Sequence, residues 1–166
     1  IISDFEKGKT QILIGTQMLS KGLDFGNVSV VGILSADSLM NFPDFRAHER
    51  AYQLMVQVSG RAGRRDKRGT VILQTTQPEH PLIRMVQHFA YKEMVSLQLS
   101  ERSMFRYPPY YRLIVLILRS RNEEALQEMS ALYAEKLRAR LGERVLGPVT
   151  PPITRVQTLH IKKIVL

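Results

Sequence analysis

The sequence predicts an α/β fold with a parallel sheet, followed by a small α+β domain. Two observations support this prediction. In the first half of the chain, compact runs rich in Val and Ile alternate with a helical pattern, as expected of parallel strands buried on both faces. After the adjacent prolines Pro108 and Pro109 the order becomes strand, helix, strand and strand, which is typical of a ferredoxin-like module. A chain of 166 residues has room for two such units.

Three strands are expected in the first part, at residues 10–15, 28–34 and 69–75. A helix is expected between the second and the third, because apolar residues recur there on one helical face. These residues are Ala47, Ala51, Leu54, Met55 and Val58. Asp44 is the expected N-cap of this helix, and Gly60 is expected to end it.

A further helix is expected at residues 82–99, and the prolines at 108–109 exclude a helix interior there. We therefore expect three segments. Residues 1–78 form the sheet-bearing domain, 79–106 contain a connecting helix, and 107–166 form a truncated α+β domain.

The α+β domain is expected to contain a strand at 111–120, a helix, and a final strand or hairpin arm at 156–166. Asn122 is the expected N-cap of the helix, and Gly142 is expected just after its last residue. The helix carries a regular apolar stripe, which we expect to pack on the sheet. The stripe consists of Leu126, Met129, Tyr133, Leu137 and Leu141.

Composition is compatible with an anionic partner such as nucleic acid, and the alternative is a solvated basic surface. The formal net charge is +9, and 16 of the 24 basic residues are arginine, the side chain best suited to phosphate. Cysteine is absent, which excludes disulfides and thiolate metal sites in these residues and fits a reducing cytoplasm. No apolar run is long enough to span a membrane. The four histidines lack metal-ligand spacing, so surface or packing roles are expected for them.

The stretch QVSGRAGRR at 57–65 is the first candidate for chemistry. Arg61 and Arg64 are three residues apart, so on one helical turn they point the same way. An arginine on a turn after a helix is placed to reach a γ-phosphate across a cleft. The alternative interpretation is a basic surface loop.

The stretch GTQMLSKGLDF at 15–25 is the second candidate, because it follows the first expected strand directly. Loops at the carboxyl ends of parallel strands are where ligands bind in open α/β sheets. The hydroxyl of Thr16 suits a phosphate of a nucleic acid strand, and the carboxylate of Asp24 suits a ribose hydroxyl. Taken alone, Thr, Lys and Asp also fill many surface loops.

Together, in this order, the two stretches resemble motifs V and VI of superfamily 2 helicases. The segments ILIGTQMLSKGLDFGNVSVVGILSAD, PDFRAHERAYQLMVQVSGRAGR, GTVILQTTQPEHP and YPPY are similar to the replication-restart, or primosomal, family of DNA helicases. This resemblance implies that residues 1–78 are part of a second, RecA-like helicase lobe. It also implies that the last domain is similar in fold to a small ribosomal protein and binds DNA.

The resemblance implies a role for each matched residue. Arg64 matches the arginine finger of motif VI, and Arg61 and Gln57 accompany it as catalytic residues. Four residues are implied on the nucleotide side, namely Gly60, Gly63, Gly22 and Asp24. Three residues are implied to contact DNA, namely Thr16, Gln17 and Lys21.

The resemblance also implies cofactors and partners. These are ATP with Mg²⁺, bound mainly by the other lobe, and zinc in an upstream cysteine-rich module but not in these residues. Forked and single-stranded DNA, primosome proteins and single-stranded DNA-binding protein are the implied partners, in the bacterial cytoplasm at the nucleoid, with no membrane. No G-x-x-x-x-G-K-[ST] loop and no Walker B motif are present, so these residues alone are expected to be inactive in ATP hydrolysis.

Three functional hypotheses follow. The first is the C-terminal portion of an ATP-dependent 3′→5′ DNA helicase that acts in replication restart and primosome assembly. The alternatives are a non-catalytic DNA-binding module and a docking module for primosome proteins. The helicase hypothesis rests on a geometric expectation, that Arg61 and Arg64 leave a helix end beside the carboxyl ends of a parallel sheet.

Overall fold

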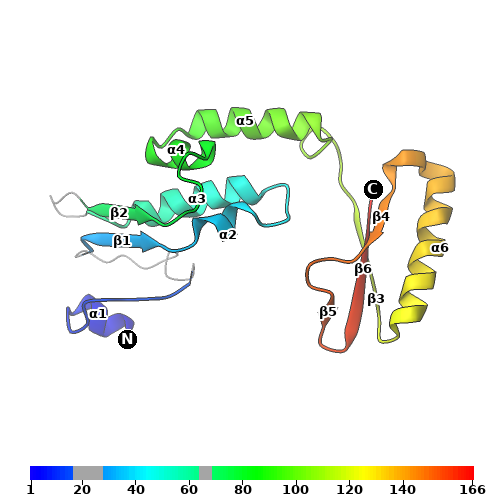
Figure 1. Cartoon of the computed structure of the whole chain (residues 1–166), viewed down its shortest axis with the longest axis horizontal. Coiled ribbons are helices and arrows are strands. Elements are labelled where there is room, and N and C mark those ends of the chain that lie inside the picture. The colour runs from blue at the N-terminus through cyan, green and yellow to red at the C-terminus, as the bar shows by residue number, and fades with distance from the viewer. Residues whose placement is uncertain (17–27, 64–68) are drawn as a thin grey trace. The chain divides into compact units, whose positions relative to one another are not determined.

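The computed structural model describes residues 1–16, 28–63 and 69–166 of the chain. The described residues form two compact units, Ile1–Phe105 and Arg106–Leu166. Both units mix helices with small sheets (Figure 1). None of the described helices is long and apolar enough to cross a membrane.

The first unit contains a parallel strand pair and five helices among its described residues. The elements are α1 (Ile2–Glu6), β1 (Val30–Ile33), α2 (Ala36–Met40), α3 (Ala47–Ser59), β2 (Thr70–Leu73), α4 (Pro81–Gln87) and α5 (Tyr91–Met104). Strands β1 and β2 run parallel, with Val30 opposite Thr70 and Ile33 opposite Leu73. Helix α3 contacts β1, α2, α4 and α5, so it lies at the centre of the unit (Figure 1).

The strand pair departs from the expected burial. Ile33 is buried and Leu73 packs against the core, whereas Val30 and Ile72 on the other face are 55% and 57% exposed. The apolar run at 28–34 predicted burial on both faces, but in the described residues the central helix α3 packs on one face of the pair. The strand expected at 10–15 is also wrong. Those residues form no regular structure, Ile12 is 79% exposed, and no described strand pairs with them.

Helix α3 begins two residues later than an N-cap at Asp44 predicts. Arg46 is the N-cap and makes no side-chain capping bond. Asp44 instead accepts a hydrogen bond from the backbone N–H of Arg46 at 2.9 Å and pairs with Arg50, also at 2.9 Å. Its carboxylate therefore supplies the negative charge that a helix N-terminus favours. The end of the helix at Gly60 is confirmed.

The single helix expected at 82–99 is in fact two helices. Phe89 adopts a left-handed backbone conformation with φ of 51°, which a helix interior does not accommodate. The N–H of Ala90 donates to the carbonyl of Met85 at 2.9 Å and closes the turn. Helix α5 then runs on to Met104, beyond the expected end.

The core of the first unit lies around the inner face of α3. Ala51, Tyr52 and Met55 of that helix are at most 3% exposed. They pack with buried residues of the later helices, including Ile83 and Met94. The predicted α3 stripe is confirmed at Ala47, Ala51 and Met55, which are all buried; Leu54 and Val58 are partly buried, and Tyr52 was not predicted.

The second unit is an antiparallel sheet with one long helix. Its elements are β3 (Val115–Ser120), α6 (Glu123–Leu141), a short 3₁₀ turn (Gly142–Arg144), β4 (Leu146–Val149), β5 (Arg155–Val156) and β6 (Leu159–Val165). Strand β6 lies between β3 and β4 and runs antiparallel to both, and β5 also pairs with it. Strands β3 and β4 are thus parallel to one another across β6. The final strand or hairpin arm predicted at 156–166 is confirmed as β6.

Helix α6 has the predicted ends but a different buried face. The side chain of Asn122 accepts from the N–H of Ala125 at 3.1 Å, and Gly142 ends the helix with φ of 61°, which confirms both predictions. The stripe prediction is largely wrong. The buried residues are Leu126, Ser130 and Ala134, whereas Met129, Tyr133 and Leu141 are 58%, 48% and 38% exposed. The buried residues follow a four-residue spacing that places the small side chains of Ser130 and Ala134 against the sheet.

Candidate functional site at the end of helix α3

A tight turn follows the last residue of α3 and contains part of the Arg-rich stretch. The N–H of Gly60 donates to the carbonyl of Val56 at 3.0 Å, and that of Arg61 donates to Val58, also at 3.0 Å. The N–H of Ala62 bonds to Ser59 at 3.2 Å. These bonds satisfy carbonyls at the helix end and fix the path of the backbone from Gly60 to Gly63.

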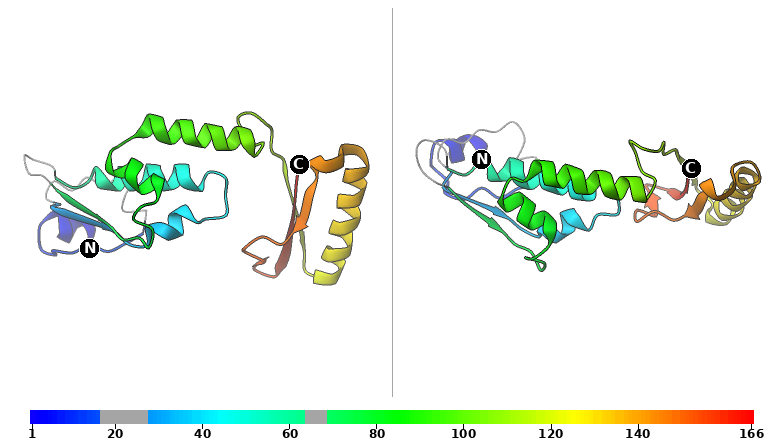
Figure 2. Two further views of the ribbon diagram at one scale, coloured as in Figure 1. Left: turned by 45° about the horizontal axis from the view of Figure 1, so that its top comes forward. Right: turned by 90° about the horizontal axis from the view of Figure 1, so that it is seen from above.

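The turn does not lie beside the carboxyl ends of the parallel strands, where the sequence predicted it. The N–H of Gly63 donates to the carbonyl of Val28 at 3.1 Å, just before β1 begins. Gly69, just before β2, lies against Ala62 and Gly63. The turn therefore lies at the amino ends of both strands and not at their carboxyl ends. The reason is chain direction, since α3 returns from the carboxyl end of β1 to the amino end of β2 (Figure 2).

The two glycines Gly60 and Gly69 differ in what surrounds them. A Cβ added to Gly69 meets the nitrogen of Gly63 at 2.3 Å and the Cβ of Ala62 at 2.6 Å. The structure has no room for a side chain there. A Cβ added to Gly60 meets its nearest atoms at 3.6 Å, which is ordinary contact. Gly60 is therefore not required by the internal packing of the described residues.

The side chains of the candidate site fall partly within the described residues. Gln57 lies on the last turn of α3 and is exposed, and Arg61 is partly buried with its Nε shielded from solvent. Thr16 is exposed. The remaining predicted residues lie outside the described part of the chain: Arg64, Gln17, Lys21, Gly22 and Asp24.

Sequence reasoning missed a polar cluster at the opposite, carboxyl end of the strand pair. The carboxylate of Asp37 accepts from the hydroxyl of Thr75 at 2.7 Å and from the N–H of Thr76 at 2.9 Å. These two donors lower the pKa of Asp37. The carboxylate thereby connects the start of α2 to the end of β2, although the two are far apart in sequence. The sequence carries no local signal for this contact, since the partners of Asp37 lie 38 and 39 positions further along the chain.

His48 of α3 and His80, the N-cap of α4, lie beside this cluster. Their ring centres are 5.4 Å apart and the ring planes are inclined at 68°. The Nδ1 of His80 accepts from the N–H of Leu82 at 3.2 Å, so its neutral form caps α4. Burial, followed by the neighbouring His48, lowers the pKa of His80, while Asp37 and Glu101 act in the opposite direction. A capping role accounts for His80 without a ligand.

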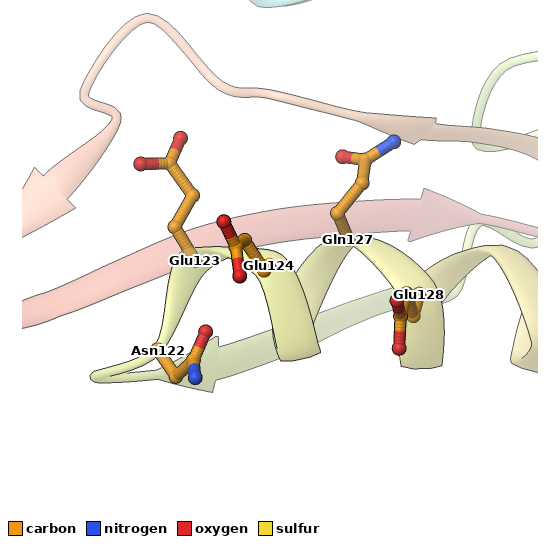
Figure 3. Close-up of a pocket in the computed structure, with 5 residues that line it drawn as sticks. All are labelled: Asn122, Glu123, Glu124, Gln127 and Glu128. Carbon is orange, nitrogen blue, oxygen red and sulfur yellow. The ribbon is translucent and has the colours of Figure 1, made fainter.

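A shallow hollow lies on α6, and its lining is acidic. It is lined by Asn122, Glu123, Glu124, Gln127 and Glu128, all at the start of the helix (Figure 3). Three carboxylates repel phosphate, so this hollow does not suit a nucleotide. No group of three or more His, Cys, Asp or Glu side chains in the described ranges is arranged to hold a metal ion.

Comparison with known proteins matches both ends of the chain. Residues 1–66 match the helicase conserved C-terminal domain, and residues 103–166 match the primosomal protein N C-terminal domain. Replication restart protein PriA of Bacillus subtilis is 44% identical over 163 residues, which cover 95% of this chain and 20% of that protein. The corresponding protein of Synechocystis is 41% identical over 159 residues, covering 94% and 19%.

The chain belongs to the PriA family. It spans about a fifth of the length of the PriA relatives named above. A third relative, PriA of Treponema pallidum, is 37% identical over 167 residues and covers 99% of this chain. The relatives are named for replication restart, and the family model that matches residues 1–66 is that of a helicase domain. The turn after α3 falls within this helicase-domain match.

Proposed function

We propose that this chain is the part of a PriA-type, ATP-dependent 3′→5′ DNA helicase that contains motifs V and VI and the C-terminal domain. In this proposal the first unit is part of a RecA-like second motor lobe and the second unit is a ferredoxin-like, DNA-binding domain. The observation that supports it best is the coincidence of the helicase-domain match with the turn after α3. The end of α3 and this turn together carry the exposed amide of Gln57 and the guanidinium of Arg61.

The described residues suit a nucleotide phosphate presented by another lobe. Arg61 supplies a permanent positive charge, and Gln57 supplies an amide on the same helix end. Gly60 has no side chain and so lets a ligand come close to the backbone. ATP with Mg²⁺ supplies the γ-phosphate, whose transfer to water develops negative charge on its oxygens.

The proposed role of this chain is to stabilise that charge and to contact DNA. Arg64 donates to the γ-phosphate oxygens as the finger, Arg61 supports it, and Gln57 orients the attacking water or the phosphate. Thr16, with Gln17 and Lys21, contacts one DNA strand. Gly22 and Asp24 connect this loop to the nucleotide. Closure of the two lobes on ATP then alternates with release after hydrolysis.

Replacement of Arg64 tests the finger in the full-length protein that contains this chain. Arg64→Ala is expected to lower the kcat of DNA-stimulated ATP hydrolysis by ~10³-fold or more, because the charge that develops in the transition state loses its donor. Arg65→Ala is the matched control, since Arg65 adjoins the finger but lies outside motif VI, and it is expected to retain activity. Near-normal turnover in Arg64→Ala would remove the finger assignment.

A second function, DNA binding by the C-terminal unit, is favoured by charge. Residues 106–166 contain eleven Lys and Arg against five Glu, a net charge of +6 out of +9 for the chain. To test this function, the affinity K for forked or single-stranded DNA is measured at increasing salt concentration. Each phosphate neutralised is expected to contribute about −0.7 to −0.9 to the slope of log K against log salt. No binding at low salt would exclude this function for the unit.

A further inference from the structure

A partly buried ion pair joins α3 to α5. The guanidinium of Arg102, near the end of α5, bonds to the carboxylate of Glu49, in the first turn of α3, at 2.5 Å. The side chain of Arg102 is only 15% exposed and that of Glu49 is 32% exposed. The residues are 53 positions apart in sequence, so this contact belongs to the tertiary structure and not to either helix alone.

The surroundings of the pair restrict the arginine further. Its guanidinium carbon lies 5.2 Å from the centre of the Phe45 ring, within the range of a cation–π interaction. Its Nε is buried and has no hydrogen-bond partner among the described residues. A planar guanidinium fits a carboxylate and a ring face together, whereas a lysine ammonium does not reproduce both contacts.

The partner helix ends at the candidate site. Glu49 lies eight residues before Gln57, about 12 Å along the helix at ~1.5 Å per residue. The pair therefore holds one end of α3 while the other end leads into the turn Gly60–Gly63. Helix α5 lies along α3 (Figure 2).

We propose that Arg102 is a positioning residue for motif VI, acting through Glu49 and the rigid body of α3. This inference rests on the proposed function of the turn. Arg102 does not touch the nucleotide. It fixes the orientation of α3 relative to α5. In this way it fixes the position of the motif VI arginines when the lobes close. Because misplacement by about 1 Å lowers rates by up to ~100-fold, loss of the pair affects the chemical step.

A double-mutant cycle in the full-length protein tests the proposal. The variants are Arg102→Gln, Glu49→Gln and the double variant, and all three remove charge while keeping hydrogen-bonding groups. Each single variant is expected to lower the DNA-stimulated kcat by about 10- to 100-fold with little change in the KM for ATP. The double variant is expected to be no worse than either single one, because both remove the same interaction.

The exposed pair Arg84–Glu79 in the same unit provides the control. Arg84 and Glu79 are 62% and 80% exposed, so Arg84→Gln is expected to leave kcat unchanged. Arg102→Lys is expected to remain impaired, since it keeps the charge without the planar contact. Additive losses in the cycle, or a wild-type kcat in Arg102→Gln, overturn the proposal.

Hydrogen exchange separates this proposal from the proposed function. In Arg102→Gln, the amides of Arg61–Gly63 are expected to exchange about tenfold faster while amides of β2 stay unchanged, since the helix end loses its fixed position. Unchanged exchange at the turn overturns the positioning role even if the wild-type protein lacks ATPase activity. Wild-type protein without ATPase activity overturns the helicase proposal alone, while faster exchange at the turn still supports the structural link.

Discussion

The close contact at Gly69 gives the sharpest prediction about the turn after α3. In Gly69→Ala, the new Cβ would meet backbone and side-chain atoms of Ala62 and Gly63 at 2.3–2.6 Å. Real Cβ atoms do not come so close, and the neighbouring atoms belong to backbone or to a short side chain that cannot move aside. The turn must therefore separate from the start of β2.

The expected cost follows from comparable overpacked sites. Insertion of a methyl group into a packed region costs about 1–3 kcal/mol. In a domain of roughly 100 residues, 1 kcal/mol corresponds to ~4–8 °C in Tm. The first unit spans Ile1–Phe105, so its Tm is expected to fall by roughly 5–20 °C in Gly69→Ala.

Gly60→Ala is the matched comparison, with the opposite expected sign. Its Cβ meets atoms only at 3.6 Å, and the backbone φ of Gly60 is −66°, which alanine adopts freely. Stability is expected to rise by about 0.4–1 kcal/mol, because the unfolded chain loses freedom. Circular dichroism at 222 nm during heating measures both variants. Equal Tm values for Gly69→Ala and the wild type would refute the packing described for this turn.

Two further predictions concern helix ends and pH. Asn122→Ala is expected to lower the stability of the second unit by about 1 kcal/mol, because the first turn of α6 loses its cap; urea unfolding of this variant beside Asn122→Asp checks it. Stability is also expected to fall as the pH drops below 6.5. The pKa of His80 is lower in the folded chain than its ordinary value of 6.5, so the unfolded chain binds the proton more tightly. Tm measured between pH 5 and 8 is expected to show this dependence, and His80→Asn is expected to reduce it. A pH dependence that is identical in His80→Asn would assign it to other groups.

Elements with local signals could be predicted from the sequence. Asn122 and Gly142 bracket α6, and Gly60 ends α3, because caps act through neighbouring backbone groups. The break at Phe89 carries no such signal, since a non-glycine residue in the left-handed region depends on its tertiary surroundings. The buried face of α6 was mispredicted because Ser130 and Ala134 are small, and size against the sheet outweighed hydrophobicity.

The candidate site could be predicted only in part. The residue types of Gln57, Gly60 and Arg61 stand out in the sequence, but the edge of the sheet that they reach depends on the direction of α3. Contacts across many residues leave no local pattern. The bond of Asp37 to Thr75 and that of Arg102 to Glu49 therefore appear only in the structure.

The central claim is that the turn after α3 faces a nucleotide held by another part of the same protein. A structure of the full-length protein with DNA and a transition-state analogue of ATP hydrolysis tests this most directly. The account predicts a guanidinium nitrogen of Arg64 or Arg61 at about 3 Å from an oxygen of the γ-phosphate position. A turn directed away from the nucleotide, with another residue in contact with that phosphate, would contradict it.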